Sequence, residues 1–356
     1  MLTYLAVLFL TSFFSLLAQY KLSYAEGAGL KPRYSLFTKF NLFIAAAVLV
    51  LVAGLRYRVG TDYAAYASNY YDYIIEVWQS IKSLDEPVIR IIAWIGSKFY
   101  NDYASMLFLA AVVTIALSMR TIYKNTDKFL FATLLYIFLG CWTGLFNGVR
   151  QYLACAIVFA GHRFIFEKKF LKYALVVFLA FLTHKSALIM IVFYFVANRK
   201  ITVMNMVILA LGTVVLLYSY DYVFEIIGWA REAPLPRDTY ITSSVNPLRI
   251  AVAIAPALLI PVYLKEIEIN PEKTFYANWL IIHGAMMVAT SRSAYLARMG
   301  IYTGIFTAIA LPMILDKKSR QNFILETAII VFYFAYWWYE IMTSSYLIPF
   351  RWIWER

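Results

Sequence analysis

The chain has 356 residues, of which 63% are hydrophobic and 15% are charged, and its formal net charge is +12. Soluble domains are nearer half apolar and a quarter charged, so this composition excludes them and indicates one all-α, polytopic membrane domain over residues 1–356. The positive charge fits basic cytoplasmic loops in contact with anionic lipid, and no basic groove-reading element appears, so we expect no nucleic-acid partner.

Apolar runs long enough to cross a bilayer recur along the whole chain, and they predict about 10–12 transmembrane helices. The predicted spans are 1–20, 38–55, 104–120, 129–146, 150–166, 201–220, 248–264, 274–290, 295–315 and 322–342, with a shorter apolar segment at 88–100. No basic residue precedes the first run, as one would in a cleaved signal peptide, so we expect that run to be a retained span.

The segment 170–197 is too long for one plain span and short for two. The triplet His184-Lys185-Ser186 interrupts it, and basic residues flank both of its ends. Cytoplasmic flanks predict a broken hairpin of two short helices with His184 at its outer tip. The alternative, a single tilted helix, buries His184 and Lys185 at mid-membrane and costs more free energy.

Basic residues set the expected orientation, because Lys and Arg collect in cytoplasmic loops. The expected inner connections are 21–39, 120–128, 163–172, 199–200, 265–273 and 317–320. The external loop regions are then 56–103 and 221–247, both with room for short helices. Lys predominates inside and Arg outside. Arg grips phosphate and carboxylate with a planar fork, so the external face suggests an anionic ligand, with snorkelling Arg at the headgroups as the alternative.

The first candidate motif begins where the second span leaves the membrane, at Arg56 and Arg58. Two Arg residues two positions apart in an irregular segment can both face a phosphate. Gly60 permits an unusual backbone turn, and Asp62 can orient an Arg or accept a proton. The alternative is an interfacial turn in which Asp62 pairs with one of the two Arg residues.

Three further Arg residues are candidates for binding an anion. Arg150 and Gln151 begin a helix at its external, positive end. Arg292 lies in an expected external turn, and Arg298 lies within the next span, where an Arg needs an anionic or water-filled partner site. For each, a snorkelling side chain is the alternative.

Another candidate motif is Thr183-His184-Lys185-Ser186, which contains one of the three histidines in the chain. His184 coincides with the external cluster, and an imidazole can serve as general base near neutral pH. The alternative is a polar tip that only breaks the helix. His162 is expected near the inner surface, and His283 as a hydrogen-bonded residue inside a span. The C-terminal tail carries Tyr346 and Arg351, which either bind substrate or form an interfacial aromatic belt.

Motifs for other chemistries do not appear. The chain has no glycine-rich phosphate loop, HExxH, GxSxG or DxD motif. We therefore expect no metal and no cofactor.

The candidate motifs together resemble the EpsG family of the broader Wzy-like polysaccharide polymerases. The pieces that carry the resemblance are Arg56 with Gly-Thr-Asp-Tyr at 60–63 and Tyr66; Arg150-Gln151 with Ala154 and Ala156; His184-Lys-Ser-Ala-Leu188; Arg298 with Pro312; and Tyr346 with Pro349. The tail departs from the family pattern by reading Ile-Pro-Phe where Pro-Tyr is expected.

The resemblance implies a GT-C-like, metal-independent glycosyltransferase of the bacterial cytoplasmic (inner) membrane, with its active site facing the periplasm or exterior. It would polymerise oligosaccharide repeat units carried on undecaprenyl diphosphate into an exopolysaccharide or O-antigen. Its expected partners are this lipid-linked oligosaccharide, the bilayer, and a chain-length regulator and flippase of the same pathway.

The resemblance also assigns provisional roles to the candidate residues. Arg150 and either Asp62 or His184 would be catalytic, and the choice of base stays open. The expected contacts to diphosphate or sugar are Arg56, Arg58, Tyr63, Tyr66, Gln151, Arg292, Arg298, Tyr346 and Arg351.

Three other functions fit parts of the pattern. A flippase for the same lipid should line a cavity with charge at mid-membrane or on both sides and usually has inverted repeats. The one-sided cluster and the absence of a repeat argue against it. An O-antigen ligase shares the chemistry but uses another acceptor. A membrane O-acyltransferase would use His184.

Overall fold

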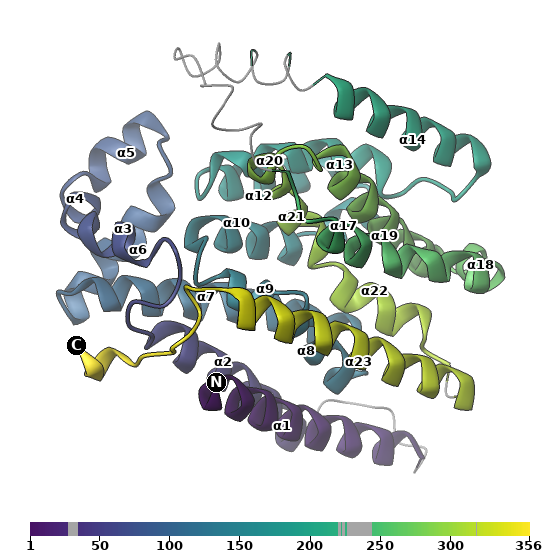
Figure 1. Ribbon diagram of the computed structural model, residues 1–356, viewed down its shortest axis with the longest axis horizontal. Coiled ribbons are helices and arrows are strands. Elements are labelled where there is room, and N and C mark those ends of the chain that lie inside the picture. The colour runs from purple at the N-terminus through teal and green to yellow at the C-terminus, as the bar shows by residue number, and fades with distance from the viewer. Residues whose placement is uncertain (28–34, 220–221, 223–224, 226–243, 318) are drawn as a thin grey trace. The chain divides into compact units, whose positions relative to one another are not determined.

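The computed structural model describes residues 1–27, 35–219, 222, 225, 244–317 and 319–356. Regular structure in these ranges is helical, apart from an isolated bridge between Arg56 and Trp352 (Figure 1). The helices are α1(Leu2–Gly27), α2(Leu36–Gly54), α3(Tyr63–Ser68), α4(Tyr70–Ile75), α5(Val77–Ser83), α6(Pro87–Phe99), α7(Tyr103–Asn125), α8(Phe129–Phe138), α9(Cys141–Gly144), α10(Val149–Ala160), α11(Arg163–Phe166), α12(Phe170–Phe181), η1(Lys185–Ile189), α13(Met190–Val196), α14(Val203–Tyr218), α17(Pro247–Ile254), η2(Ala255–Leu259), α18(Ile260–Glu268), α19(Pro271–Ala289), α20(Ala294–Ala297), α21(Gly300–Gly304), α22(Thr307–Ile314), α23(Arg320–Thr343) and η3(Ile353–Glu355). Most of the predicted loop 221–247 lies outside the described residues.

Long apolar helices confirm the prediction of an all-α polytopic membrane protein. Among the described residues, five helical segments are long and apolar enough to span a bilayer: Leu2–Tyr20, Leu36–Gly54, Tyr103–Asn125, Pro247–Glu268 and Arg320–Thr343. A sixth is counted if the pair Ala294–Gly304 and Thr307–Ile314, bent by 46°, is one span. Shorter apolar helices occupy other predicted spans, among them Phe129–Phe138 and Val203–Tyr218. The chain is a multi-pass membrane protein.

Several predicted spans are interrupted rather than continuous. The predicted span 129–146 is α8 followed by the one-turn α9, because Gly140 adopts a left-handed conformation with φ of 74° and ends α8. The predicted span 295–315 is divided into α20, α21 and α22. Hydropathy detects the apolar length of such segments but not the backbone breaks within them.

The segment 170–197 forms the predicted broken hairpin. Helix α12 ends at Phe181, residues 182–184 leave the α-helical conformation, and the chain resumes as η1 and α13. The ring of Phe170, at the start of α12, lies 5.0 Å from that of Tyr194 near the end of α13. The two ends of the segment are therefore in contact, with His184 at the break between them.

The chain divides into two compact units, residues 1–163, 171–188 and 315–356 in one and residues 164–170 and 189–314 in the other. In the first unit α1 lies along α2, and α7 packs against α2, α6 and α10 (Figure 1). Polar side chains join these apolar helices, since Ser15 bonds Thr133 at 3.1 Å and the Trp142 indole donates to the Leu49 carbonyl at 3.1 Å. Four short helices, α3 to α6, occupy the segment between α2 and α7.

The second unit packs around α19. The rings of Trp279 and Phe306 stack in parallel, with centroids 3.9 Å apart. The Asn278 amide donates to the carbonyls of Ala197 and Arg199, at 2.9 and 2.6 Å, and so satisfies carbonyls just beyond α13. His283 is partly buried and its Nδ1 bonds the Thr303 hydroxyl at 3.0 Å, as expected for a hydrogen-bonded residue inside a span.

Candidate functional site

A strained turn between α5 and α6 positions the first functional side chain. Leu84 and Glu86 both have positive φ, 55° and 48°, a conformation that non-glycine residues rarely adopt. Pro87 follows at the first position of α6, where its fixed φ starts the helix. Strained residues of this kind persist where surrounding contacts hold them, and they cluster at functional sites.

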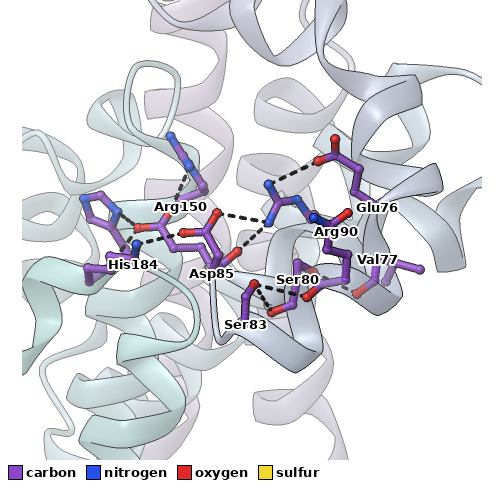
Figure 2. Close-up of polar contacts among 11 residues, drawn as sticks. Glu76, Val77, Ser80, Ser83, Asp85, Arg90, Arg150 and His184 are labelled. Carbon is purple, nitrogen blue, oxygen red and sulfur yellow. Dashed lines mark hydrogen bonds and ion pairs between the residues drawn. The ribbon is translucent and has the colours of Figure 1, made fainter. Parts of the chain in front are cut away.

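Glu86 is 8% exposed and is the centre of a cluster of polar side chains. Its Oε1 accepts hydrogen bonds from the ring Nδ1 of His184 at 2.7 Å and from the backbone N–H of Lys185 at 3.0 Å. Its Oε2 accepts one from the guanidinium of Arg150 at 2.6 Å. Figure 2 shows Arg150 and His184 converging on the turn that carries Asp85. One carboxylate thus fixes a cation from α10 and an imidazole from the hairpin break.

The charge state of Glu86 determines how His184 is oriented. Burial alone would raise the pKa of Glu86, but the hydrogen bond from His184 and the charge of Arg150 outweigh it and hold that pKa below its ordinary value. An ionised carboxylate only accepts, so Nδ1 of His184 carries a proton. In the neutral ring this leaves Nε2 as a proton acceptor, on a side chain that is 29% exposed.

A second set of charges surrounds this centre (Figure 2). The Nζ of Lys185 lies 2.8 Å from Asp85, and Arg90 lies 3.5 Å from Asp85 and 3.6 Å from Glu76. The hydrogen bond from Lys185 is the main reason why the pKa of Asp85 is lowered. These ion pairs connect α4, α5 and α6 to the residue after His184, and they hold the turn of Glu86 in place.

Arg150 also contacts the first candidate motif. Its backbone N–H donates to the buried Tyr66 hydroxyl at 3.2 Å, and its guanidinium lies 5.9 Å from the Tyr66 ring centroid. The side chain of Arg150 is 37% exposed, so part of the guanidinium remains open to a ligand. The structure therefore brings Arg150, Tyr66 and His184 together.

The turn predicted at Gly60 is confirmed. Gly60 has φ of 105°, and a Cβ at this position would overlap the carbonyl oxygen of Phe146. Next to it, the backbone N–H of Thr61 donates to the Asn147 side chain at 2.8 Å. Glycine alone both adopts this positive φ readily and has no Cβ to overlap Phe146. The hydrogen bond from Thr61 to Asn147 connects the first motif to the loop that precedes Arg150.

Arg56 lies in a different environment from Arg150. It is 1% exposed, donates from Nε to the Val59 carbonyl at 3.1 Å and also donates to the Ala53 carbonyl at the end of α2. Its guanidinium lies 5.0 Å from the Phe146 ring and 5.9 Å from that of Tyr63, and its Nη2 has no hydrogen-bond partner among the described residues. Burial lowers its pKa to about 10.

Other predicted residues of the first unit lie around these two Arg residues. Tyr63 and Gln151 are buried. Asp62 is partly exposed and accepts a hydrogen bond from the Thr61 hydroxyl at 3.1 Å. Arg58 is exposed and lies 5.4 Å from the Tyr57 ring. In this fully described segment Asp62 forms no ion pair with Arg56 or Arg58.

The tail lies against the first motif through its main chain. The carbonyl of Tyr346 accepts from Gly60 at 2.9 Å, and the carbonyl of Arg351 accepts from Tyr57 at 2.8 Å, while both tail side chains are exposed. At the end of the chain, Arg356 grips Asp102 with two hydrogen bonds of 2.7 and 2.6 Å.

Arg292 and Arg298 belong to the second unit. Arg292 is exposed and donates to the Leu217 carbonyl at 3.4 Å, and Arg298 is the exposed residue between α20 and α21. No group of three or more His, Cys, Asp or Glu side chains able to hold a metal ion occurs in the described ranges.

Glu86 and Asp85 were not among the residues that the sequence singled out. In sequence they form an acidic pair before a helix-starting Pro, which is typical of a solvated turn. Glu86 is 64 residues from Arg150 and 98 from His184, so no local spacing reveals these contacts. The nearest available signal is that two acidic residues are adjacent inside the predicted external region 56–103, which is rich in aromatic residues.

Comparison with known proteins identifies the family. A model described as the EpsG family matches residues 39–352, a range that contains every predicted site residue. No curated protein and no solved structure matches the chain. The family is associated with glycosyltransferase-like polymerase activity in exopolysaccharide formation. The chain belongs to the EpsG family.

Proposed function

We propose that the protein polymerises oligosaccharide repeat units carried on undecaprenyl diphosphate, on the outer face of the bacterial cytoplasmic membrane. The observation that carries the proposal is that Glu86 holds an imidazole and a guanidinium on a single carboxylate. Glycosyl transfer from a lipid diphosphate requires these two kinds of group, because the acceptor must lose a proton and the leaving group gains negative charge.

In the proposed step, an acceptor sugar hydroxyl attacks the anomeric carbon of the growing chain. A new C–O bond forms, and the bond from that carbon to the diphosphate oxygen breaks. The hydroxyl proton passes to Nε2 of His184. The lipid diphosphate leaves with the bonding electron pair, and Arg150 stabilises its charge with those donors that Glu86 does not occupy.

Two observations support His184 rather than Asp62 as the base. The Nδ1 of His184 faces a carboxylate, so its Nε2 is oriented to accept a proton. Among the residues that the structure describes, none forms an ion pair with the Asp62 carboxylate, which accepts a hydrogen bond from the neighbouring Thr61 hydroxyl.

The proposal is tested in a strain that lacks the gene and expresses Arg150→Ala or His184→Gln from a plasmid. Both variants should reach the membrane at normal levels. Both should leave single repeat units on the lipid acceptor, whereas the wild type gives a ladder of long polymer on a gel.

Other gel patterns would contradict the proposal. Complete loss of surface glycan in the variants would indicate a flippase or a ligase. Unchanged ladders that lack acetyl groups would indicate an acyltransferase.

A further inference from the structure

Helices α4 and α5 form one nearly continuous helix that leads to the turn of Glu86. Only Glu76 separates them, and backbone hydrogen bonds from Glu76 to Asp72 and from Ser80 to Glu76 run across the break. One face of this helix is buried, and both α4 and α5 pack on α6. The buried residues, spaced three, four and three apart as one stripe along a helix, are Tyr70, Tyr73, Val77 and Ser80.

The two remaining faces of this helix differ in polarity. One holds large apolar side chains that are 61%, 77% and 67% exposed, namely Tyr71, Ile75 and Trp78. The other holds exposed polar side chains, namely Asp72, Glu76, Gln79 and Ser83. A helix that projects into water is polar over its whole exposed surface. The apolar face therefore indicates an apolar environment on that side of the helix.

Helix α6 has an exposed apolar face of the same kind. Trp94, Ile95 and Phe99 are exposed on it. The Nζ of Lys98 lies 5.0 Å from the centroid of the Trp94 ring, so the aliphatic part of Lys98 runs along this face. On α5, the exposed Lys82 follows Trp78 by four residues and shares its face. Lys side chains that cover apolar surface beside Trp rings are typical of a membrane interface.

The three helices lie at the level where a span begins. Helix α6 ends at Phe99, four residues before Tyr103, the first residue of α7, which is long enough to cross the bilayer. At its other end the Val88 N–H donates to the Leu182 carbonyl at 3.3 Å, so α6 reaches the break of the hairpin. Figure 1 shows α3 to α6 together at the end of the first unit where α7 begins. The start of a span lies near the bilayer surface, so α6 and the helices packed on it lie at that surface too.

We propose that the apolar faces of α4, α5 and α6 lie in the headgroup layer of the bilayer, on the side of the candidate site. Amphipathic helices bind a bilayer with the apolar face at the boundary of the acyl chains and the charged face in water. In this orientation Lys82 and Lys98 reach lipid phosphates, and Asp72 faces water. Because α5 ends at Ser83, just before the strained turn, the contact holds Glu86 at the bilayer surface. This contact does not depend on the reaction at the site.

Spin labels on two faces of α4 test the proposal in the full chain, in nanodiscs of phosphatidylethanolamine and phosphatidylglycerol. Tyr71→Cys places a label on the apolar face. Asp72→Cys is the matched control, since the next residue along a helix is turned by about 100° onto the polar face. Both positions are exposed, so neither label should disturb packing. The native Cys141 and Cys155 are buried, and unsubstituted protein measures their background labelling.

The measurement is the rate of collision of each label with oxygen, which concentrates in the bilayer, and with a water-soluble nickel complex. The oxygen-to-nickel ratio at position 71 should exceed that at position 72 about tenfold or more, because an apolar layer excludes a polar complex. Equal ratios would overturn the proposal. A label at position 71 that is shielded from both reagents would also overturn it, and would indicate that a second copy of the chain covers this face.

Charge variants test whether the apolar face of α5 carries the contact. With a label at Ile95→Cys on α6, Trp78→Glu should lower the oxygen-to-nickel ratio severalfold, because a carboxylate is disfavoured in the apolar layer. Gln79→Glu adds the same charge on the polar face and should leave the ratio unchanged. Equal ratios in the two variants would overturn the proposal.

Discussion

The sequence predicts that Arg56 and Arg150 both lie on the external side, yet the structure gives them opposite environments. Arg56 is buried, bonds backbone carbonyls at the end of α2 and lies against two aromatic rings. Arg150 is 37% exposed in its side chain and pairs with a buried carboxylate that also holds His184. A fully enclosed Arg stabilises the fold, whereas a partly exposed Arg oriented by a carboxylate can bind a ligand.

The largest expected effect is on activity at Arg150. Arg150→Ala should lower polymer formation about 10²–10³-fold, because a positioned donor to the leaving group is lost. The measurement is the rate of polymer formation by purified protein, with thermal unfolding as the check on folding. An Arg150→Ala protein that remains folded and polymerises at the wild-type rate would show that Arg150 has no role in activity.

The next effect is on stability at Arg56. Arg56→Met removes the donors to the carbonyls of Ala53 and Val59 and should lower the free energy of unfolding by about 3 kcal/mol. Arg56→Lys should recover only part of this loss, since one ammonium replaces the guanidinium fork. Thermal unfolding in detergent measures both variants. An Arg56→Met protein as stable as the wild type but inactive would show that Arg56 acts on substrate.

A smaller, pH-dependent effect is expected at Glu86. His184 and Arg150 each donate to a different oxygen of Glu86. Gln has an oxygen on one side only and would place its NH₂ donor against one of these two donors. Glu86→Gln should therefore lower the free energy of unfolding by about 2 kcal/mol near neutral pH. Because the pKa of Glu86 is lowered in the folded protein, its stabilisation is complete above the ordinary value of 4.5 and is lost as pH falls below that value.

The wild-type protein should therefore be more stable than the Glu86→Gln protein at neutral pH, and the two stabilities should converge as pH falls below the ordinary pKa of Glu, 4.5. Thermal unfolding of both proteins across this range measures the difference. Asp85 and Asp102 also have lowered pKa values, but both proteins retain them. A difference that persists unchanged in acid would mean that the charge of Glu86 does not stabilise the cluster.

The smallest effect is expected at the end of the chain. Asp102→Asn weakens the ion pair between Asp102 and Arg356. Because both side chains are partly exposed, the free energy of unfolding should fall by only about 0.5–1 kcal/mol. Polymer formation should be unchanged. A large loss of activity in a stable Asp102→Asn protein would show that the docked tail contributes to the site.

Much of the fold follows from the sequence because bilayer-length apolar runs have few alternative structures. The broken hairpin is predictable for the same reason, since His184-Lys185 interrupts a segment of unsuitable length. The breaks at Gly140 and between α21 and α22 are not, because hydropathy does not depend on backbone angles. Gly60 was identifiable, since glycine between Arg58 and Asp62 indicates an unusual turn.

The candidate site was predictable only in part. Arg150 and His184 have residue types and positions that suggest chemistry. Glu86 owes its role to burial and to partners far along the chain, and neither is visible in a turn that reads Asp-Glu-Pro. The same limit applies to Arg56, since its enclosure depends on the packing of Phe146 and Tyr63 rather than on its neighbours in sequence.

Reconstitution of purified wild-type and His184→Gln protein with defined undecaprenyl-diphosphate-linked repeat units tests the central claim most directly. The account predicts that the wild type converts single units into a ladder of oligomers without a nucleotide sugar, and that the folded variant does so at least about 10²-fold more slowly. Wild-type protein that leaves the units unjoined, or a variant that joins them at the wild-type rate, would contradict it.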